Sequence, residues 1–157
     1  MLGVTKNGWR YPEAAPANTE VKNLEWGAQG FDVVGTRNEL GTGKENTRLI
    51  YNALRARNES GRAAQICRQM TTGKNNDWYL PSREELHWMY LNLHKAGLGN
   101  FKNARYWSST QNSARDAWYI HFGENGRAST SYAKDRGMWI TIIYDTGEIW
   151  TRAIRSF

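Results

Sequence analysis

Residues 106–122 read YWSSTQNSARDAWYIHF and surround a polar run with large aromatic side chains. In the second half of this stretch, Trp118 and Phe122 alternate with Tyr119 and His121. Because successive side chains of a strand point to opposite faces, this period of two predicts a half-buried strand. We expect Trp118 and Phe122 to be buried as scaffold and Tyr119 and His121 to be exposed, together with the polar run.

Strand signals continue to the end of the chain. GENG (123–126) is a turn, and residues 138–157 contain MWITIIY and IWTRAIRSF on either side of DTGE. This pattern is typical of a β-hairpin in which Gly supplies a backbone conformation that other residues resist. The last third of the chain is therefore predicted to be rich in antiparallel strands.

Helical signals occupy the middle of the chain. GKENTRLIYNALRAR (43–57) and GRAAQICRQM (61–70) carry apolar residues at helical spacing. In residues 77–97, Ser82 and Glu85 form a capping box that starts a longer helix. Its predicted buried stripe is Leu86, Met89, Tyr90 and Leu93, and Gly97 is its predicted end.

The front of the chain is irregular, with one short strand predicted in VKNLEWGA (21–28). Helices followed by antiparallel strands indicate the α+β class. At 157 residues, the chain fits a single domain, residues 1–157. With 39% hydrophobic and 23% charged residues, it is neither a disordered chain nor a membrane-inserted one.

The cysteine content limits the possible chemistry, whereas the N-terminus neither shows nor excludes secretion. Cys67 is the only cysteine, which excludes intrachain disulfides and zinc sites with several cysteines, and its helical pattern predicts a buried side chain. The N-terminus, MLGVTKNGWR, shows no apolar segment typical of a signal peptide.

The formal charge of +6 raises the question of nucleic-acid binding. Residues 44–105 hold eleven basic and five acidic side chains, whereas residues 1–43 and 106–157 are nearly balanced. Single-strand binders interleave cations with stacking aromatics, but four of the eight Trp lie in the nearly neutral last third. This distribution argues against a nucleic-acid partner.

No catalytic motif is complete. GTGKENT (41–47) lacks the first Gly and the final Ser or Thr of a phosphate loop, so we interpret it as a turn before a helix. His87 and His94 have no nearby third metal ligand, and Glu84 and Glu85 project in different directions. We therefore expect no enzymatic activity, no metal and no cofactor.

Several of these segments together resemble one known family. GWRYPEAAP, GTGKENT and the helix after it, DWYLPSREELHWMYLNL, YWSST, AWYIHF and the ending TRAIRSF occur in this order in bacterial and phage domains with a C-type-lectin-like fold. That family is similar to the C-terminal domain of collagen-like adhesins and to the variable proteins of diversity-generating retroelements. The resemblance covers Gly8 to Phe157.

The resemblance implies two main helices packed on short antiparallel sheets, with ligands bound near the C-terminal strands. In retroelement-diversified relatives, the residues that vary lie in the segment matching Asn112 to Tyr132, while Trp107, Trp118 and Phe122 match the scaffold. Tyr, Arg, Asn and Ser side chains on a rigid scaffold are also typical of a paratope. The implied ligand-binding residues are Asn112, Ser113, Ala114, Arg115, Asp116, Tyr119, His121, Arg127, Ser129, Ser131 and Tyr132.

The chain departs from the family pattern at two places. Only MLGVTKN precedes GWRYPEAAP, where relatives have an additional strand, and residues 136–150 resemble an added hairpin. Trp139, Tyr144 and Trp150 there could serve the core, an oligomer interface or the binding surface. The calcium-binding and paired-cysteine motifs of other proteins with this fold are missing from the sequence.

The sequence thus predicts a non-enzymatic ligand-recognition module with a variable C-terminal surface. We expect its partner to be a protein or glycan on a cell surface, bound from a virion tail or the bacterial exterior. The sequence leaves open whether the chain forms a homo-oligomer. The alternative is an adhesin that binds acidic polysaccharide through the basic helical segment, with Arg48, Arg55, Arg62 and Arg68 as its contacts.

Overall fold

The computed structural model describes residues 4–5, 8–9, 11–131 and 148–157. The predicted helices are confirmed, and they begin and end close to the expected residues. The Ser82 hydroxyl accepts a hydrogen bond from the Glu85 N–H at 3.3 Å, and the Glu85 carboxylate accepts one from the Ser82 N–H at 2.8 Å, so the predicted capping box is present. The helices are α1 (Gly43–Ala56), α2 (Ala63–Gln69), α3 (Arg83–Met89), the π-helical turn η2 (Tyr90–His94) that continues α3, and the 3-10 turn η1 (Ala17–Thr19).

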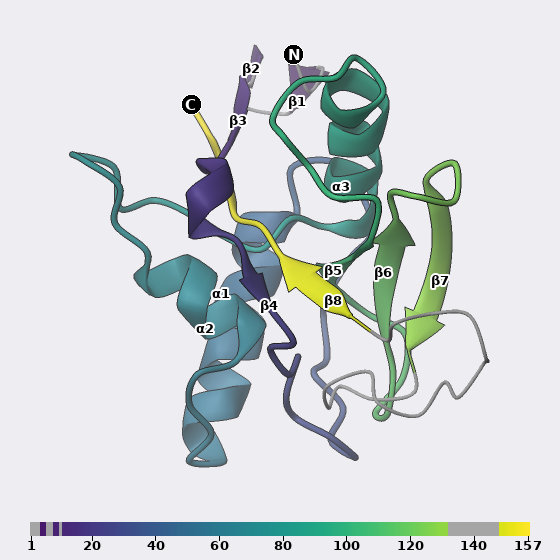
Figure 1. Cartoon of the computed structure of the whole chain (residues 1–157). Helices are drawn as coiled ribbons and strands as arrows, with labels where there is room; N and C mark the ends of the chain where they lie inside the picture. Colours follow the sequence, from purple (N-terminus) through teal and green to yellow (C-terminus); the bar gives the residue numbers. More distant parts are fainter. Residues whose placement is uncertain (1–3, 6–7, 10, 132–147) are drawn as a thin grey trace.

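The described strands form one five-stranded sheet in the order β4-β8-β5-β6-β7 and two small sheets, β1-β2 and β3-β9. Figure 1 shows α1 and α2 to the lower left of the large sheet and α3 above it. The α+β class is thus confirmed. The strands are β1 (Val4–Thr5), β2 (Gly8–Trp9), β3 (Pro12–Ala14), β4 (Val21–Lys22), β5 (Arg105–Gln111), β6 (Ala117–His121), β7 (Arg127–Ser131), β8 (Ile149–Thr151) and β9 (Ile154–Ser156).

One strand pair differs from the predicted antiparallel arrangement. β8 pairs antiparallel with β4 but parallel with β5, with Tyr106 opposite Trp150. β8 lies on the side of β5 that β6 does not occupy, and it runs in the same direction as β5 and β7. IWTRAIRSF is also two strands and not one, since β8 belongs to the large sheet and β9 pairs with β3. The first strand of the predicted hairpin, from Met138 to Tyr144, lies outside the described residues.

The front of the chain contains more structure than the sequence predicted. β3 pairs antiparallel with β9, and the backbone groups of Tyr11 and Phe157 exchange hydrogen bonds of 3.0 and 3.2 Å. β3 and the C-terminal segment of the chain therefore lie side by side (Figure 1). Three residues of regular alternation are too few to predict a strand from sequence, so β3 can be recognised only from its pairing with β9.

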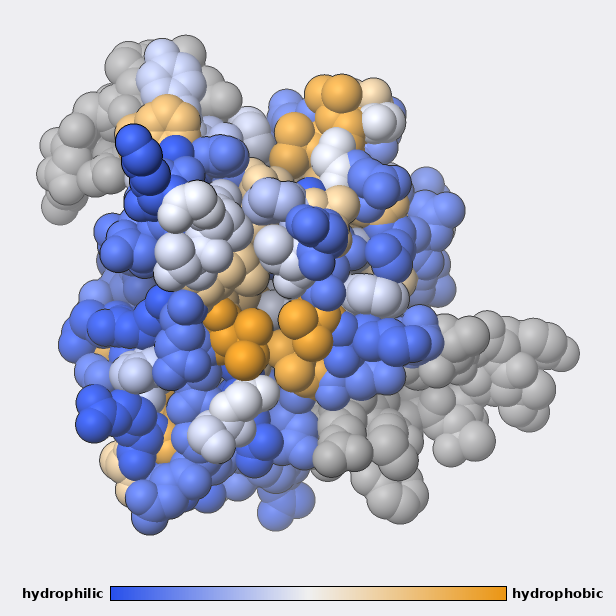
Figure 2. All heavy atoms as spheres, turned by 60° about the vertical axis from the view of Figure 1, so that its left-hand side comes forward, coloured by the Kyte–Doolittle hydropathy of each residue, from blue (hydrophilic) through white to orange (hydrophobic). Residues whose placement is uncertain are grey.

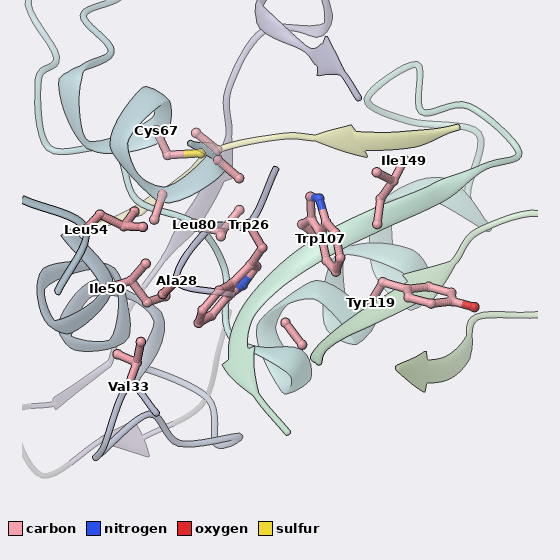
Figure 3. Close-up of a cluster of buried hydrophobic side chains, with 14 of the residues drawn as sticks. Trp26, Ala28, Val33, Ile50, Leu54, Cys67, Leu80, Trp107, Tyr119 and Ile149 are labelled. Carbon is pink, nitrogen blue, oxygen red and sulfur yellow. The ribbon is translucent and has the colours of Figure 1, made fainter. Parts of the chain in front are cut away.

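The large sheet buries residues on both of its faces. Trp107, Ala117 and Tyr119 join a cluster with Trp26 and Ile50. In Figure 3, Trp107 and Trp26 lie between α1 and the sheet, and the Tyr119 ring extends away from them with its hydroxyl at the far end. A second cluster, under α3, is built on the opposite face by Tyr106, Leu86, Met89, Tyr90, Ile120 and Phe122.

This two-sided burial corrects the expected exposure of β6. The predicted alternation is right, because Ile120 and Phe122 belong to one cluster and Tyr119 to the other. However, Tyr119 is only 8% exposed, so its predicted exposure is wrong. Trp118 was expected to be buried and is instead partly exposed at the rim of its face. Period-two alternation separates the two faces but does not reveal that both are covered.

Two sequence motifs meet at a buried carboxylate. Glu85 is fully buried and accepts hydrogen bonds from the N–H of Gly41 at 3.0 Å and of Ser82 at 2.8 Å. A Cβ atom on Gly43 would collide with this carboxylate and lie 2.8 Å from the Ser82 nitrogen. Burial raises the pKa of Glu85 despite these hydrogen bonds. GTGKENT is therefore the turn before α1 that the sequence predicted, and its glycines make room for α3.

Candidate functional site

The polar run between the aromatic residues forms a tight turn from β5 to β6. The N–H groups of Asn112 and Ser113 donate to the carbonyl oxygen of Asp116 at 2.9 and 3.0 Å. The Ser113 hydroxyl donates to the Asp116 carboxylate at 2.5 Å and accepts from the N–H of Arg115 at 3.1 Å. Because these bonds fix the backbone, Asn112 and Arg115 are presented as exposed side chains on a defined turn.

A loop from the front of the chain lies directly beside this turn. The Gly30 N–H donates to the Ala114 carbonyl oxygen, and the Val33 N–H donates to the Gln111 side chain, each at 2.8 Å. The Gln111 N–H in turn donates to the Thr36 hydroxyl at 3.1 Å. Gln111 therefore joins residues 30–36 to the end of β5.

This loop adds exposed apolar residues that the sequence analysis missed. Val33 is 4% exposed and anchors the loop in the core, while its neighbour Val34 is 77% exposed and Phe31 is 43% exposed. The Arg57 guanidinium lies 5.0 Å from the centre of the Phe31 ring. The available signal was the sequence FDVV, which places three apolar residues between two glycines and is too short to show a clear period.

The base of the same loop is clamped by a carboxylate from the α1–α2 connection. Ala28 is buried with a φ of 52°, a left-handed conformation that costs energy in a residue other than glycine. Its N–H donates to the Glu59 carboxylate at 3.1 Å, which also pairs with Arg57 and Arg62. Burial alone would raise the pKa of Glu59, but hydrogen bonds from Arg57, the Ala28 N–H and Arg62 lower it overall.

The other predicted residues lie on the β6–β7 hairpin. Tyr119 pairs with Ser129 and His121 pairs with Arg127, so these four side chains share one face of the two strands. Arg127 is exposed, and Ser129 and His121 are partly exposed. Ser131 is paired with Ala117 in the same register, and Tyr132 lies outside the described residues.

A loose charged group marks the far end of this hairpin. The Glu124 carboxylate lies 3.9 Å from His121 Nε2 and 3.7 Å from an Arg127 guanidinium nitrogen. The Gly123 N–H donates to His121 Nδ1 at 3.1 Å, which leaves Nε2 as the nitrogen that faces Glu124. The Glu124 and Arg127 side chains are 55% and 72% exposed, so both are accessible to a partner.

The predicted site residues therefore form two groups and not one. The turn 112–116 adjoins the first residue of β6, whereas His121 is its last residue and Arg127 lies opposite His121 on β7. A rise of about 3.3 Å per residue places the two groups about 13 Å apart. Ser129 lies between them, opposite the buried Tyr119 ring.

Trp118 contributes to the opposite rim of the sheet. The Arg83 guanidinium lies 4.9 Å from the centre of the Trp118 ring, and the Arg83 N–H donates to the Thr110 hydroxyl at 3.0 Å. Trp150, one of the residues of the added segment, is half-buried and packs against the second core cluster. Trp139 and Tyr144 lie outside the described residues.

The described residues contain no group of three or more His, Cys, Asp or Glu side chains that could hold a metal ion. The His87 ring stacks on Tyr90 and the His94 ring lies tilted against it, with ring centres 6.2 and 5.7 Å away. The Cys67 thiol is fully buried, which raises its pKa and confirms the predicted core position.

None of the helices in the described parts of the chain has the length and apolar character that a membrane span needs. Comparison with protein-family models and with curated proteins finds no match to this chain.

Proposed function

We propose that this chain is a non-enzymatic recognition module with a C-type-lectin-like fold, and that it binds a protein or glycan on a cell surface. Its recognition surface consists of loop 30–36 and turn 112–116, extended along the β6–β7 hairpin by His121, Arg127 and Ser129. The resemblance to retroelement-diversified proteins suggests that the module is carried by a phage particle or a bacterial exterior.

The observation that carries this proposal is the hydrogen-bonded union of the loop with the turn. Gly30 bonds to Ala114 and Val33 bonds to Gln111, so two segments distant in sequence present their side chains on one fixed backbone. Preorganisation of this kind favours binding because little conformational freedom is lost when a partner docks. A catalytic site would instead need a cluster of reactive groups.

The composition of the surface supports a macromolecular partner. Val34 and Phe31 are exposed apolar side chains, and Asn112 and Arg115 beside them are exposed polar ones. Protein interfaces combine apolar anchors with a polar rim, and Arg is common among the residues that dominate binding. Buried Tyr119 belongs to the scaffold under this surface and not to its contacts.

Whole-cell binding tests the proposal. The fluorescently labelled chain is incubated with a panel of bacterial strains, and bound cells are counted by flow cytometry. Two variants are compared with it: a turn variant, Asn112→Ala with Arg115→Ala, and a hairpin variant, His121→Ala with Arg127→Ala. The control variant, Lys74→Ala with Asn76→Ala, also removes one cation and one amide but lies outside the recognition surface.

We expect the turn variant to lose at least about tenfold in affinity, which corresponds to about 1.4 kcal/mol, and the control variant to bind like the original chain. Circular dichroism should show all three variants folded, because the replaced side chains are exposed or half-buried. Equal binding by the turn variant, the hairpin variant and the original chain would contradict the proposed surface.

A further inference from the structure

Most acidic residues of the middle segment form ion pairs with particular cations. The remaining positive charge therefore lies on a small number of side chains. In residues 44–105, all of which the structure describes, Arg48, Arg57, Arg62, Arg83 and Lys102 form ion pairs with carboxylates. Arg105 and Glu85 are buried. The exposed cations of this segment outside such pairs are Lys44, Arg55, Arg68, Lys74 and Lys95.

Two of these five cations, Arg55 and Arg68, lie beside the Tyr51 ring, and Lys44 lies on the same side of α1. Lys44, Arg48, Tyr51 and Arg55 follow one side of α1, because they are separated by four, three and four residues. The distance from the first to the last is about 16 Å along the helix. Arg68 joins them from α2, with its guanidinium 4.6 Å from the centre of the Tyr51 ring, whereas that of Arg55 lies at 6.0 Å.

This line of side chains, here named the basic stripe, consists of Lys44, Arg48, Tyr51, Arg55 and Arg68. Glu45 is the only acidic residue of α1, and α2 has none. Glu45 holds Arg48 through two hydrogen bonds of 2.6 and 2.8 Å, and its carboxylate is thereby occupied. The side of the molecule with α1 and α2 comes forward in Figure 2, and it is mostly hydrophilic around a small central apolar area.

The arrangement around Tyr51 favours anionic groups over nucleic-acid bases. Proteins that bind single strands use open aromatic faces on which bases stack. Here the Arg68 guanidinium lies over the Tyr51 ring, so the stripe presents planar guanidinium groups and not a free ring. Guanidinium groups bind carboxylate and sulfate oxygens through paired hydrogen bonds.

We propose that the basic stripe is a second binding site, which takes a linear polysaccharide carrying carboxylate or sulfate groups. Arg55 and Arg68 are its principal contacts, and Lys44 extends it along α1. Arg48 and Arg62 contribute less, since both are already paired with carboxylates. The site uses none of the residues of the recognition surface, so either site can exist without the other.

The test is a titration of the full chain with fluorescent heparin oligosaccharide over a series of salt concentrations. The stripe variant is Arg55→Gln with Arg68→Gln, and the charge-matched control is Lys74→Gln with Lys95→Gln. All four positions are exposed, and circular dichroism verifies the fold of each protein. Hyaluronan, which carries only carboxylates, separates carboxylate from sulfate recognition, and neutral dextran and single-stranded DNA complete the set of competitors.

We expect the stripe variant to bind heparin at least about tenfold more weakly at low salt. The slope of log affinity against log salt concentration should become shallower by roughly one for each lost arginine, because one fewer counterion is released. The control variant should bind nearly as the original chain does. Equal losses in both variants would show a response to net charge alone and overturn the site. Stronger competition by single-stranded DNA than by heparin, or no heparin binding at low salt, would overturn it as well.

Discussion

The side-chain oxygen of Gln111 accepts a hydrogen bond of 2.8 Å from the backbone N–H of Val33, 78 residues earlier in the chain. Val33 is buried, and Gln111 is the last residue of β5. This contact connects the core to the proposed recognition surface, because the exposed loop residues on either side of Val33 follow its position.

Replacing Gln111 with Ala should loosen the loop without unfolding the protein. The substitution leaves the Val33 N–H without its partner, so we expect a loss of about 1–3 kcal/mol in the free energy of unfolding. Amide hydrogen exchange of residues 30–36 should become faster than that of α1. Gln69→Ala, at an exposed glutamine on α2, is the control, and unchanged exchange in the loop of the Gln111 variant would contradict this role.

Gly43 should not tolerate a methyl group although it lies in a helix. Gly→Ala within a helix normally stabilises by up to about 1 kcal/mol. At Gly43 the added Cβ would meet the Glu85 carboxylate and the Ser82 backbone, so we expect a net destabilisation of about 1–3 kcal/mol. Urea unfolding measures this difference, and a stabilised Gly43→Ala variant would show that the contact between the turn and α3 can adjust.

The clamp at Glu59 predicts a pH dependence with a defined sign. The folded state lowers the pKa of Glu59 from its ordinary value of 4.5, so its contribution to stability is present above pH 4.5 and is lost as the pH falls through the folded value. We expect Glu59→Gln to cost about 1 kcal/mol at neutral pH, since solvent screens this partly exposed carboxylate.

Urea midpoints measured from pH 7 down to pH 3 should therefore converge for the original chain and for Glu59→Gln. Glu45→Gln is a suitable comparison, because that carboxylate binds Arg48 on the surface and does not hold the loop. Parallel curves for Glu59→Gln and the original chain over the whole range would contradict the clamp.

Tyr119 and His121 should respond differently to replacement by Ala. The Tyr119 ring is part of a core cluster, so Tyr119→Ala should cost roughly 3–5 kcal/mol. His121→Ala, at a partly exposed position, should lower the free energy of unfolding by less than about 1 kcal/mol. Thermal unfolding monitored by circular dichroism distinguishes them, and an unchanged midpoint for Tyr119→Ala would show that this ring does not stabilise the fold.

The helices were predictable because their signals are local. The capping box of Ser82 and Glu85, the apolar spacing in α1 and the buried position of Cys67 each depend on residues within one or two turns. The motif GTGKENT was also recognised as a turn before a helix. The contact of this turn with α3 was not predictable, because the hydrogen-bond partner of the Gly41 N–H is Glu85, 44 residues later.

The candidate site was predicted only in part for the same reason. The polar turn and the β6 alternation are local features, and both are present in the structure. The burial of Tyr119 depends on a cluster that includes Trp26 and Ile50, and the place of Phe31 and Val34 beside the turn depends on Gln111. Contacts between distant segments decide both, and no local period encodes them.

Tolerance to substitution under selection for folding tests the central claim most directly. Two display libraries are compared by protease resistance, one randomised at exposed or partly exposed positions of the recognition surface (Val34, Asn112, Arg115, Arg127 and Ser129) and one at positions beneath it (Trp107, Tyr119, Ile120 and Phe122). A rigid scaffold under an adaptable surface predicts that most clones of the first library remain folded, that few of the second do, and that panning the first library against lysozyme enriches binders. Equal loss of folded clones from both libraries would contradict the claim, because the surface would then be part of the core.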